Sequence, residues 1–163
     1  MKLLDSFSFQ NQRFLIRVDY NVPMDSDLNI TDDTRMRATL PTINKIISSG
    51  GSVVLMSHRG RPKGLDDSLS MRHLVSRLSD LLSQEVKFID HCIGDKVTKT
   101  SKSLKSGEVL LVENLRFHDE ETAGDIDFAK QLSELGDVYV NDAFGTAHSC
   151  LLYTSPSPRD TLL

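Results

Sequence analysis

Five short runs of apolar, mostly β-branched residues recur along the chain, and stretches with helical spacing separate them. All but the first show little alternation between apolar and polar residues, which is typical of strands buried on both faces of a parallel sheet. Because strands alternate with helices, we expect an α/β fold with a parallel sheet and helices on both of its faces. The five expected strands span residues 13–19, 52–57, 85–89, 108–113 and 137–141.

Apolar residues at helical spacing predict the helices that connect these strands in a Rossmann-like arrangement. Pro41 lies inside the first helix, so we expect a kink or a late start there. The last helix should end at Gly136, in the role of a C-cap glycine. The expected helices span residues 32–49, 69–83, a shorter stretch within 92–107, and 124–136. The last is expected to bury a face formed by Ile126, Ala129, Leu132 and Leu135.

A chain of 163 residues is expected to form one domain, and the strand–helix pattern places it at residues 1–148. Residues 149–163 follow neither period, and their Ser-Pro-Ser-Pro segment is a poor continuation of any helix or strand. This tail resembles translated adapter sequence. We therefore expect it to be artefactual, without a regular element, and unrelated to the domain.

The composition disfavours several classes of protein. No run approaches 18 apolar residues and the N-terminus lacks an apolar signal core, so we expect neither a membrane span nor secretion. Two cysteines, Cys92 and Cys150, form neither a disulfide framework nor a metal-binding spacing. We expect a cytoplasmic protein without a metal site. The net charge of -4 and the absence of Trp argue against nucleic-acid binding.

Polar and basic side chains follow most of the expected strands where each strand ends. Ligands of open α/β sheets bind beyond these carboxyl ends. Several arginines at one edge repel one another unless an anion lies between them, and the guanidinium fork matches phosphate and carboxylate oxygens. The sequence therefore predicts a site for a small, multiply charged anion. The residues at the exits include Asp19, Asn21, His58, Arg59, Arg61, Lys63, Asn114, Arg116, His118, Asn141, Asp142, Thr146 and His148.

Each of these motifs is weak when taken alone. Arg17 beside Asp19 is equally consistent with a structural ion pair, and the segment 57–64 with an exposed basic loop. The sequence also lacks a P-loop, a dinucleotide-binding fingerprint, a zinc-ligand spacing and a nucleophile elbow. It thus indicates an anion site without a recognisable nucleotide site.

Five segments in order resemble the phosphoglycerate kinase family: RVDYNVPMD, DDTRMRATLPTI, SHRGRPKG, LLVENLRFHDEE and VYVNDAFGTAH. The resemblance implies the N-terminal domain of a two-domain kinase of glycolysis. Such an enzyme transfers a phosphoryl group between ATP and 3-phosphoglycerate, giving 1,3-bisphosphoglycerate and ADP. In the family the C-terminal domain binds the Mg-nucleotide. The resemblance ends at residue 148, so we expect this chain to bind no cofactor and to be inactive alone.

The resemblance also assigns roles to residues of this chain. Arg35 corresponds to the arginine that binds the substrate carboxylate and stabilises the transferring phosphoryl group, which makes it the one expected catalytic residue. Arg116 corresponds to a phosphate-binding arginine. The expected substrate-binding residues are Asp19, Asn21, Arg35, His58, Arg59, Gly60, Arg61 and Arg116. Arg59 stands at a variable position of the family, and Gly60 allows the backbone to approach a ligand closely.

One departure from the family pattern affects the site. Ser149 stands where the family has a further phosphate-binding arginine, so we expect weakened binding of 3-phosphoglycerate. A non-catalytic anion-binding α/β module is the alternative function, because the same residues serve it without a second domain. The full-length form is expected to be a monomer without nucleic-acid or membrane partners.

Overall fold

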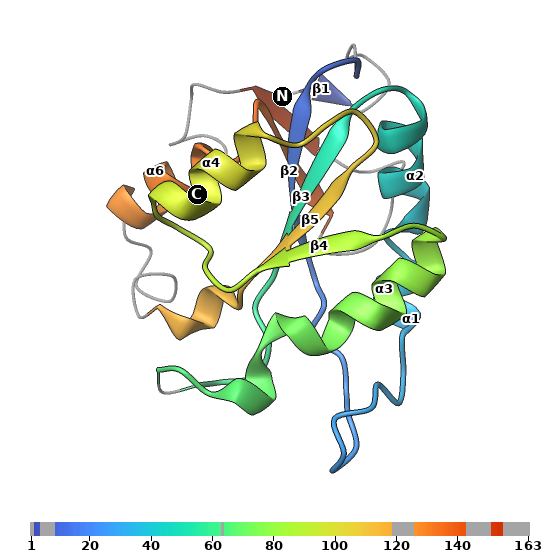
Figure 1. Cartoon of the computed structure of the whole chain (residues 1–163), viewed down its shortest axis with the longest axis vertical. Helices are drawn as coiled ribbons and strands as arrows, with labels where there is room; N and C mark the ends of the chain where they lie inside the picture. The colour runs from blue at the N-terminus through green and yellow to red at the C-terminus, as the bar shows by residue number, and fades with distance from the viewer. Residues whose placement is uncertain (1, 4–8, 63, 119–125, 143–150, 155–163) are drawn as a thin grey trace.

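The computed structural model describes residues 2–3, 9–62, 64–118, 126–142 and 151–154. Five neighbouring strands of one sheet are parallel, in the order β6-β2-β3-β5-β4 (Figure 1). The predicted parallel strands are thereby confirmed, each end within one residue of its expected position. They are β2 (Arg13–Val18), β3 (Ser52–Met56), β4 (Val86–Ile89), β5 (Val109–Val112) and β6 (Val138–Asp142).

Two further strands extend the sheet beyond β6. Strand β7 (Leu151–Thr154) pairs antiparallel with β6 and with β1 (Lys2–Leu3). The prediction that the tail contains no regular element was therefore wrong for these four residues. Pairing with the edge of β6 uses backbone hydrogen bonds and needs no apolar period in the added strand, so the sequence pattern carried no signal for it. The other tail residues lie outside the described part of the chain.

Helices connect the strands as expected, with shorter spans. The first predicted helix divides into α1 (Thr34–Arg37) and α2 (Leu40–Ser48), and Pro41 lies in the first turn of α2. Proline suits a first turn because its missing N–H has no partner there, which confirms the late start. The other helical segments are η2 (Asp67–Leu69), η3 (Met71–Leu74), α3 (Val75–Leu82), α4 (Asp95–Lys102), η4 (Leu115–Phe117) and α6 (Ile126–Ser133), where η denotes a 3₁₀ turn.

The predicted buried face of α6 is confirmed at Leu132 and Leu135 and wrong at Ile126, and Phe128 lies in the core instead. Phe128, Leu132 and Leu135 are buried at helical spacing, whereas Ile126 is 59% exposed. The Phe128 ring belongs to the same core as Leu132 and Leu135, and Ile126 faces outward. The helix ends at Ser133, so Gly136 is not its C-cap. Gly136 instead packs against β2, where an added Cβ atom would lie 2.7 Å from a side-chain atom of that strand.

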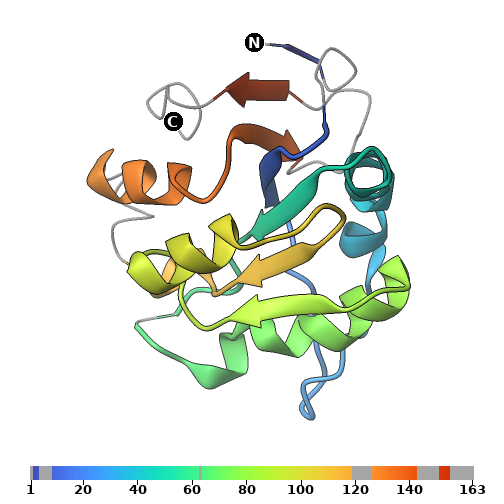
Figure 2. The same cartoon turned by 45° about the horizontal axis from the view of Figure 1, so that its top comes forward.

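The strands carry a separate apolar core on each face of the sheet, as a sheet covered on both sides requires. In β2, Phe14 and Ile16 belong to the core under α2 and α3, whereas Leu15 belongs to the core under α4 and α6. Figure 2 shows the two pairs of helices on opposite faces. The helices thus cover the faces of the sheet and leave the strand ends to the loops.

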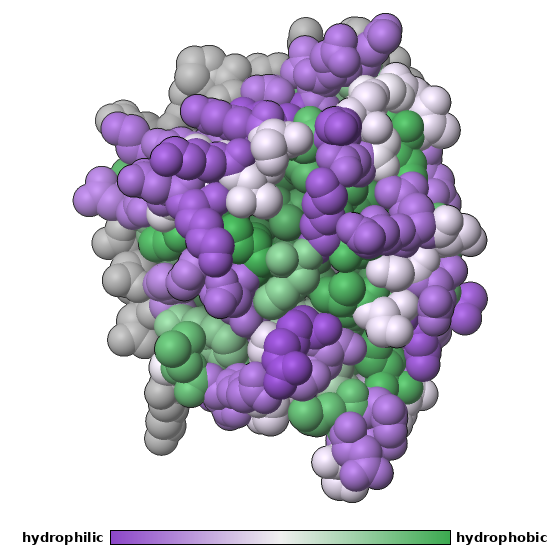
Figure 3. Space-filling model, viewed as in Figure 1, coloured by the Kyte–Doolittle hydropathy of each residue, from purple (hydrophilic) through white to green (hydrophobic). Residues whose placement is uncertain are grey.

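Strand β4 forms the other edge of the described sheet. In Figure 3, apolar side chains show between α4 and α3 where β4 lies, and polar side chains surround them. Lys87 of β4 forms an ion pair with Glu108, with 2.8 Å between Nζ and Oε2. A charged side chain on an edge strand disfavours pairing with another chain. None of the helices in the described ranges has the length and apolar character of a membrane span.

Candidate anion-binding site

The carboxyl ends of β2, β3 and β5 lie side by side because these strands are neighbours in the sheet. Arg17 near the end of β2 pairs with Met56 at the end of β3, and Leu55 of β3 pairs with Leu111 of β5. The loops that leave these strands therefore start from one edge of the sheet. We call this edge, with Asp19, Asn21, Arg35, residues 57–62 and Asn114–Arg116, the carboxyl rim.

Arg35 reaches the carboxyl rim from α1. Its Nη1 atom donates to Oδ1 of Asp19 at 3.2 Å and to the backbone oxygen of Asn21 at 3.0 Å. The side chain is 53% exposed, and its Nε and Nη2 atoms make no hydrogen bond with the described residues. A guanidinium uses such a free edge to bind a carboxylate through two parallel hydrogen bonds.

Asp33 fixes the short helix that carries Arg35. Its carboxylate accepts hydrogen bonds from Nε of Arg37 at 2.8 Å and from Nη1 of Arg77 at 2.9 Å. These bonds hold the pKa of the Asp33 carboxyl below its usual value, and partial burial opposes the shift. Because Arg77 belongs to α3, Asp33 links α1 to a longer helix of the core. A four-residue helix has little stability by itself, so this link keeps Arg35 in place.

The loop after β3 is tied to the loop after β2 at two points. The backbone N–H of Gly60 donates to Oδ1 of Asn21 at 2.9 Å, and that of Tyr20 donates to Oγ of Ser57 at 3.0 Å. Gly60 has φ +65°, a conformation that favours glycine. The bond to Gly60 brings Asn21 to the segment that carries His58 and Arg61.

Arg59 is buried within the same loop. Its Nη1 atom donates to the backbone oxygen of Ser68 at 2.7 Å, and its Nη2 atom lies 2.9 Å from Sδ of Met24. Burial lowers the pKa of the Arg59 guanidinium, and the Asp66 carboxylate opposes this shift. The side chain thus bridges two loops. This placement was not foreseen from the sequence, where Arg59 stands among exposed basic residues.

Arg116 lies in η4, directly after β5. Its backbone N–H donates to Oδ1 of Asn114 at 2.9 Å, and the same oxygen accepts the backbone N–H of Arg59 at 3.1 Å. The sequence placed Asn114 at the strand exit but gave it no role. An Asn before a short helical turn signals a cap, yet nothing local reveals that the side chain also holds a loop 55 residues away.

The structure brings most of the expected site residues together. Asp19, Asn21, Arg35 and Gly60 are joined by direct hydrogen bonds, and Asn114 joins the backbones of Arg59 and Arg116. His58 is half-buried in the same loop, and Arg61 is exposed without a hydrogen bond or ion pair to the described residues. Their roles in binding stay predictions. Lys63, Thr146, His148 and Ser149 lie outside the described residues.

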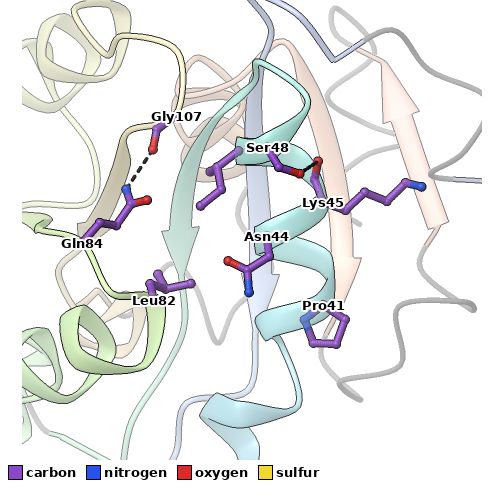
Figure 4. Close-up of a pocket in the computed structure, with 8 residues that line it drawn as sticks. Pro41, Asn44, Lys45, Ser48, Leu82, Gln84 and Gly107 are labelled. Atoms are coloured by element: carbon purple, nitrogen blue, oxygen red, sulfur yellow. Dashed lines mark hydrogen bonds between the residues drawn. The ribbon is translucent and has the colours of Figure 1, made fainter.

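Two hollows of about 710 Å³ each lie on the described surface, one away from the carboxyl rim and one that reaches it at Asn114. The first lies between α2 and α3 near the amino ends of the strands, away from the carboxyl rim; Figure 4 shows Gln84 beside it, donating to the oxygen of Gly107 at 2.8 Å. The second lies at the exits of β4 and β5, beside His91 and Phe117. Within the described ranges, no three His, Cys, Asp or Glu side chains gather as metal ligands do.

The fold and the carboxyl rim together define an α/β domain with basic, hydrogen-bonded loops at the ends of its parallel strands. The sequence model of the phosphoglycerate kinase family matches residues 4–151. The chain belongs to the phosphoglycerate kinase family.

Curated relatives and solved structures agree with this assignment. The phosphoglycerate kinase of Chlorobium chlorochromatii is 53% identical over 148 residues, and that of Aquifex aeolicus 49% over 147; each match covers 90% of this chain and 37% of the relative. The Pyrococcus horikoshii enzyme superposes with a TM-score of 0.79 at 40% identity, covering 88% of this chain and 37% of that structure. The Coxiella burnetii enzyme superposes with a TM-score of 0.77 at 33% identity, covering 88% of this chain and 35% of that structure. The chain therefore spans about 37% of the length of the curated relatives it matches.

Proposed function

We propose that this chain is the phosphoglycerate-binding part of a phosphoglycerate kinase. The whole enzyme would transfer a phosphoryl group between ATP and 3-phosphoglycerate, giving 1,3-bisphosphoglycerate and ADP, in the cytoplasm as a step of glycolysis. The observation that carries this proposal is the position of Arg35, which Asp19 and the Asn21 backbone hold at the carboxyl rim with a free guanidinium edge. The family membership supplies the reaction.

The proposed site works by position and charge. In phosphoryl transfer the protein contributes little covalent chemistry and acts mainly by orienting the groups and neutralising their charge. The free edge of Arg35 would bind the substrate carboxylate and spread the charge that develops on the transferring phosphoryl group. His58, Arg61 and Arg116 would bind the phosphate that remains on the substrate. Asn21 would keep the loop with His58 and Arg61 close to Arg35, because its side chain binds Gly60.

Mg-ATP or Mg-ADP would be bound by the part of the family enzyme that this chain does not span, since the chain covers 37% of its curated relatives. The family's nucleotide site implies a second domain, which approaches the carboxyl rim during the reaction. We therefore propose that the chain by itself binds 3-phosphoglycerate weakly and does not turn over. A coupled assay with the purified chain, ATP and 3-phosphoglycerate should show no rate above background.

Titration calorimetry tests the proposed site directly. We expect 3-phosphoglycerate to bind saturably at millimolar concentration, and Arg61→Gln and Arg116→Gln each to weaken this binding about 10-fold. Lys45→Gln is the matched control, because it removes one exposed positive charge beside the hollow between α2 and α3. No binding at millimolar ligand would overturn the proposal. Equal affinity for 3-phosphoglycerate and sulfate would favour the non-catalytic anion-binding module instead.

A further inference from the structure

Asn114 uses its whole hydrogen-bonding capacity between two loops of the carboxyl rim. Its Oδ1 atom accepts the backbone N–H of Arg59 at 3.1 Å and of Arg116 at 2.9 Å. Its Nδ2 atom donates to the backbone oxygens of Arg59 at 2.7 Å and of Leu69 at 2.9 Å. A side-chain amide offers two donors and two acceptor lone pairs, so all four are satisfied.

The bonds of the Asn114 side chain are buried on the Arg59 side and partly buried on the Leu69 and Arg116 side, and together they require an amide. Its side chain is fully buried, with 0% exposure. A carboxylate would lack the donors that the Arg59 and Leu69 oxygens require, and an apolar side chain would leave four buried or partly buried backbone groups without this partner. Neither change is compatible with the present loop arrangement. The residue type is thus set by what it connects.

The two loops that Asn114 joins carry the basic side chains of the site. Arg59 stands between His58 and Gly60 in the loop after β3, two residues before Arg61, and Arg116 belongs to the turn after β5. The backbone N–H of Leu115 also donates to the oxygen of Ser57 at 3.1 Å, which ties the starts of the same two loops. Beyond this bond, the Asn114 side chain connects the two loops again through the backbones of Arg59 and Arg116.

We propose that Asn114 is a positioning residue that makes Arg116 converge with His58 and Arg61 on one phosphate group. This proposal rests on the proposed function, because it assumes that the carboxyl rim binds the phosphate of 3-phosphoglycerate. Asn114 touches no ligand in this arrangement. It sets the separation between the two loops, so that basic side chains from both of them contact the same anion.

Asn114→Ser separates the capping of the turn at Arg116 from the connection to the loop after β3. A serine oxygen can still cap the turn by accepting the Arg116 N–H, but it cannot reach Arg59 and Leu69 at the same time. We expect this variant to bind both inorganic phosphate and 3-phosphoglycerate about 10-fold more weakly, by phosphorus NMR titration. Arg35→Gln should weaken 3-phosphoglycerate alone, because inorganic phosphate has no carboxylate. An equal loss of affinity for both ligands indicates a change in the residues that bind the phosphate group.

Leu82→Ala is the control for lost stability, since Leu82 is buried beside the hollow between α2 and α3 and far along the chain from either loop. It should lower the midpoint of urea unfolding and leave both affinities unchanged. If Asn114→Ser does not fold, amide exchange of Arg59 and Arg116 in the unchanged protein is the second measure: added phosphate should slow both together.

The outcomes separate this proposal from the proposed function. A folded Asn114 variant with unchanged phosphate affinity, or exchange at Arg59 and Arg116 that does not respond to phosphate, would overturn the role of Asn114. If the unchanged protein binds 3-phosphoglycerate no more tightly than inorganic phosphate, the proposed function is overturned and the positioning role of Asn114 still holds. Absence of phosphate binding in the unchanged protein would overturn both.

Discussion

The Nη1 atom of Arg35 lies 3.2 Å from Oδ1 of Asp19, although the two residues are 16 positions apart in the chain. Asp19 follows β2 and Arg35 belongs to α1. The pair is partly exposed, so it adds little to the free energy of unfolding. Its consequence is geometric: it directs one end of the guanidinium toward the strand exit and leaves the opposite edge for a ligand.

Arg35→Lys should therefore weaken ligand binding without unfolding the protein. An ammonium group cannot bind Asp19 and also present a planar fork to a carboxylate. We expect the 3-phosphoglycerate affinity to fall about 10-fold and the free energy of unfolding to change by less than about 1 kcal/mol. Arg72→Lys, which changes an exposed, ion-paired arginine outside the carboxyl rim, is the matched control. Calorimetry that shows equal losses for the two variants would contradict the assigned role of Arg35.

Gly60→Ala should destabilise the loop after β3 more than Gly64→Ala does. Both glycines have positive φ, so both substitutions carry a backbone penalty of about 1 kcal/mol. At Gly60 the new Cβ atom would also lie 2.7 Å from Cδ2 of Leu69, whereas nothing lies within 4 Å of the site at Gly64. We expect the difference between the two variants to disappear when Leu69→Ala is added, as measured by urea unfolding. A difference that persists would exclude the Leu69 contact as its cause.

The sequence predicted the parallel strands well because each is a compact apolar run that needs no distant partner for its recognition. It also predicted the strand exits as the place of the site, since parallel strands have their carboxyl ends on one edge. It could not predict the burial of Arg59 or the bridging bonds of Asn114. Both depend on backbone atoms of loops distant in the chain, namely Ser68 for Arg59 and Arg59 itself for Asn114.

The face of α6 shows a second limit of sequence patterns. Ile126 lies three residues before Ala129 and Phe128 lies four residues before Leu132, so each position has an apolar partner at helical spacing. Which of the two side chains is buried depends on how the helix packs against the sheet, and the sequence of the helix alone does not determine that packing. The strand formed by Leu151–Thr154 is a similar case, because the open edge of β6 determines its pairing.

Asp33 should make the stability of the protein depend on acid pH. Hydrogen bonds from Arg37 and then Arg77 lower the pKa of Asp33 in the folded state, whereas an unfolded Asp has a pKa of about 3.9. The resulting stability is fully present above that value and is lost as the pH falls through the lower folded pKa. Asp33→Asn should therefore be less stable than the unchanged protein at pH 6, and the gap should close near pH 2. Urea unfolding that shows a constant gap at both pH values would mean that the loss comes from packing.

Deletion of residues 151–163 should make the protein self-associate. The deletion removes β7 and leaves the backbone groups of β6 without the partners they have between Val138 and Asn141. An open edge strand is a template for pairing with a second chain, so we expect a concentration-dependent shift toward dimers in analytical ultracentrifugation. Leu152→Pro should act in the same direction, because proline cannot donate a ladder hydrogen bond and residue 152 pairs with both Val140 and Lys2. Deletion of residues 155–163 alone retains β7 and serves as the control. A monomer at all concentrations after the longer deletion would show that β7 does not protect this edge.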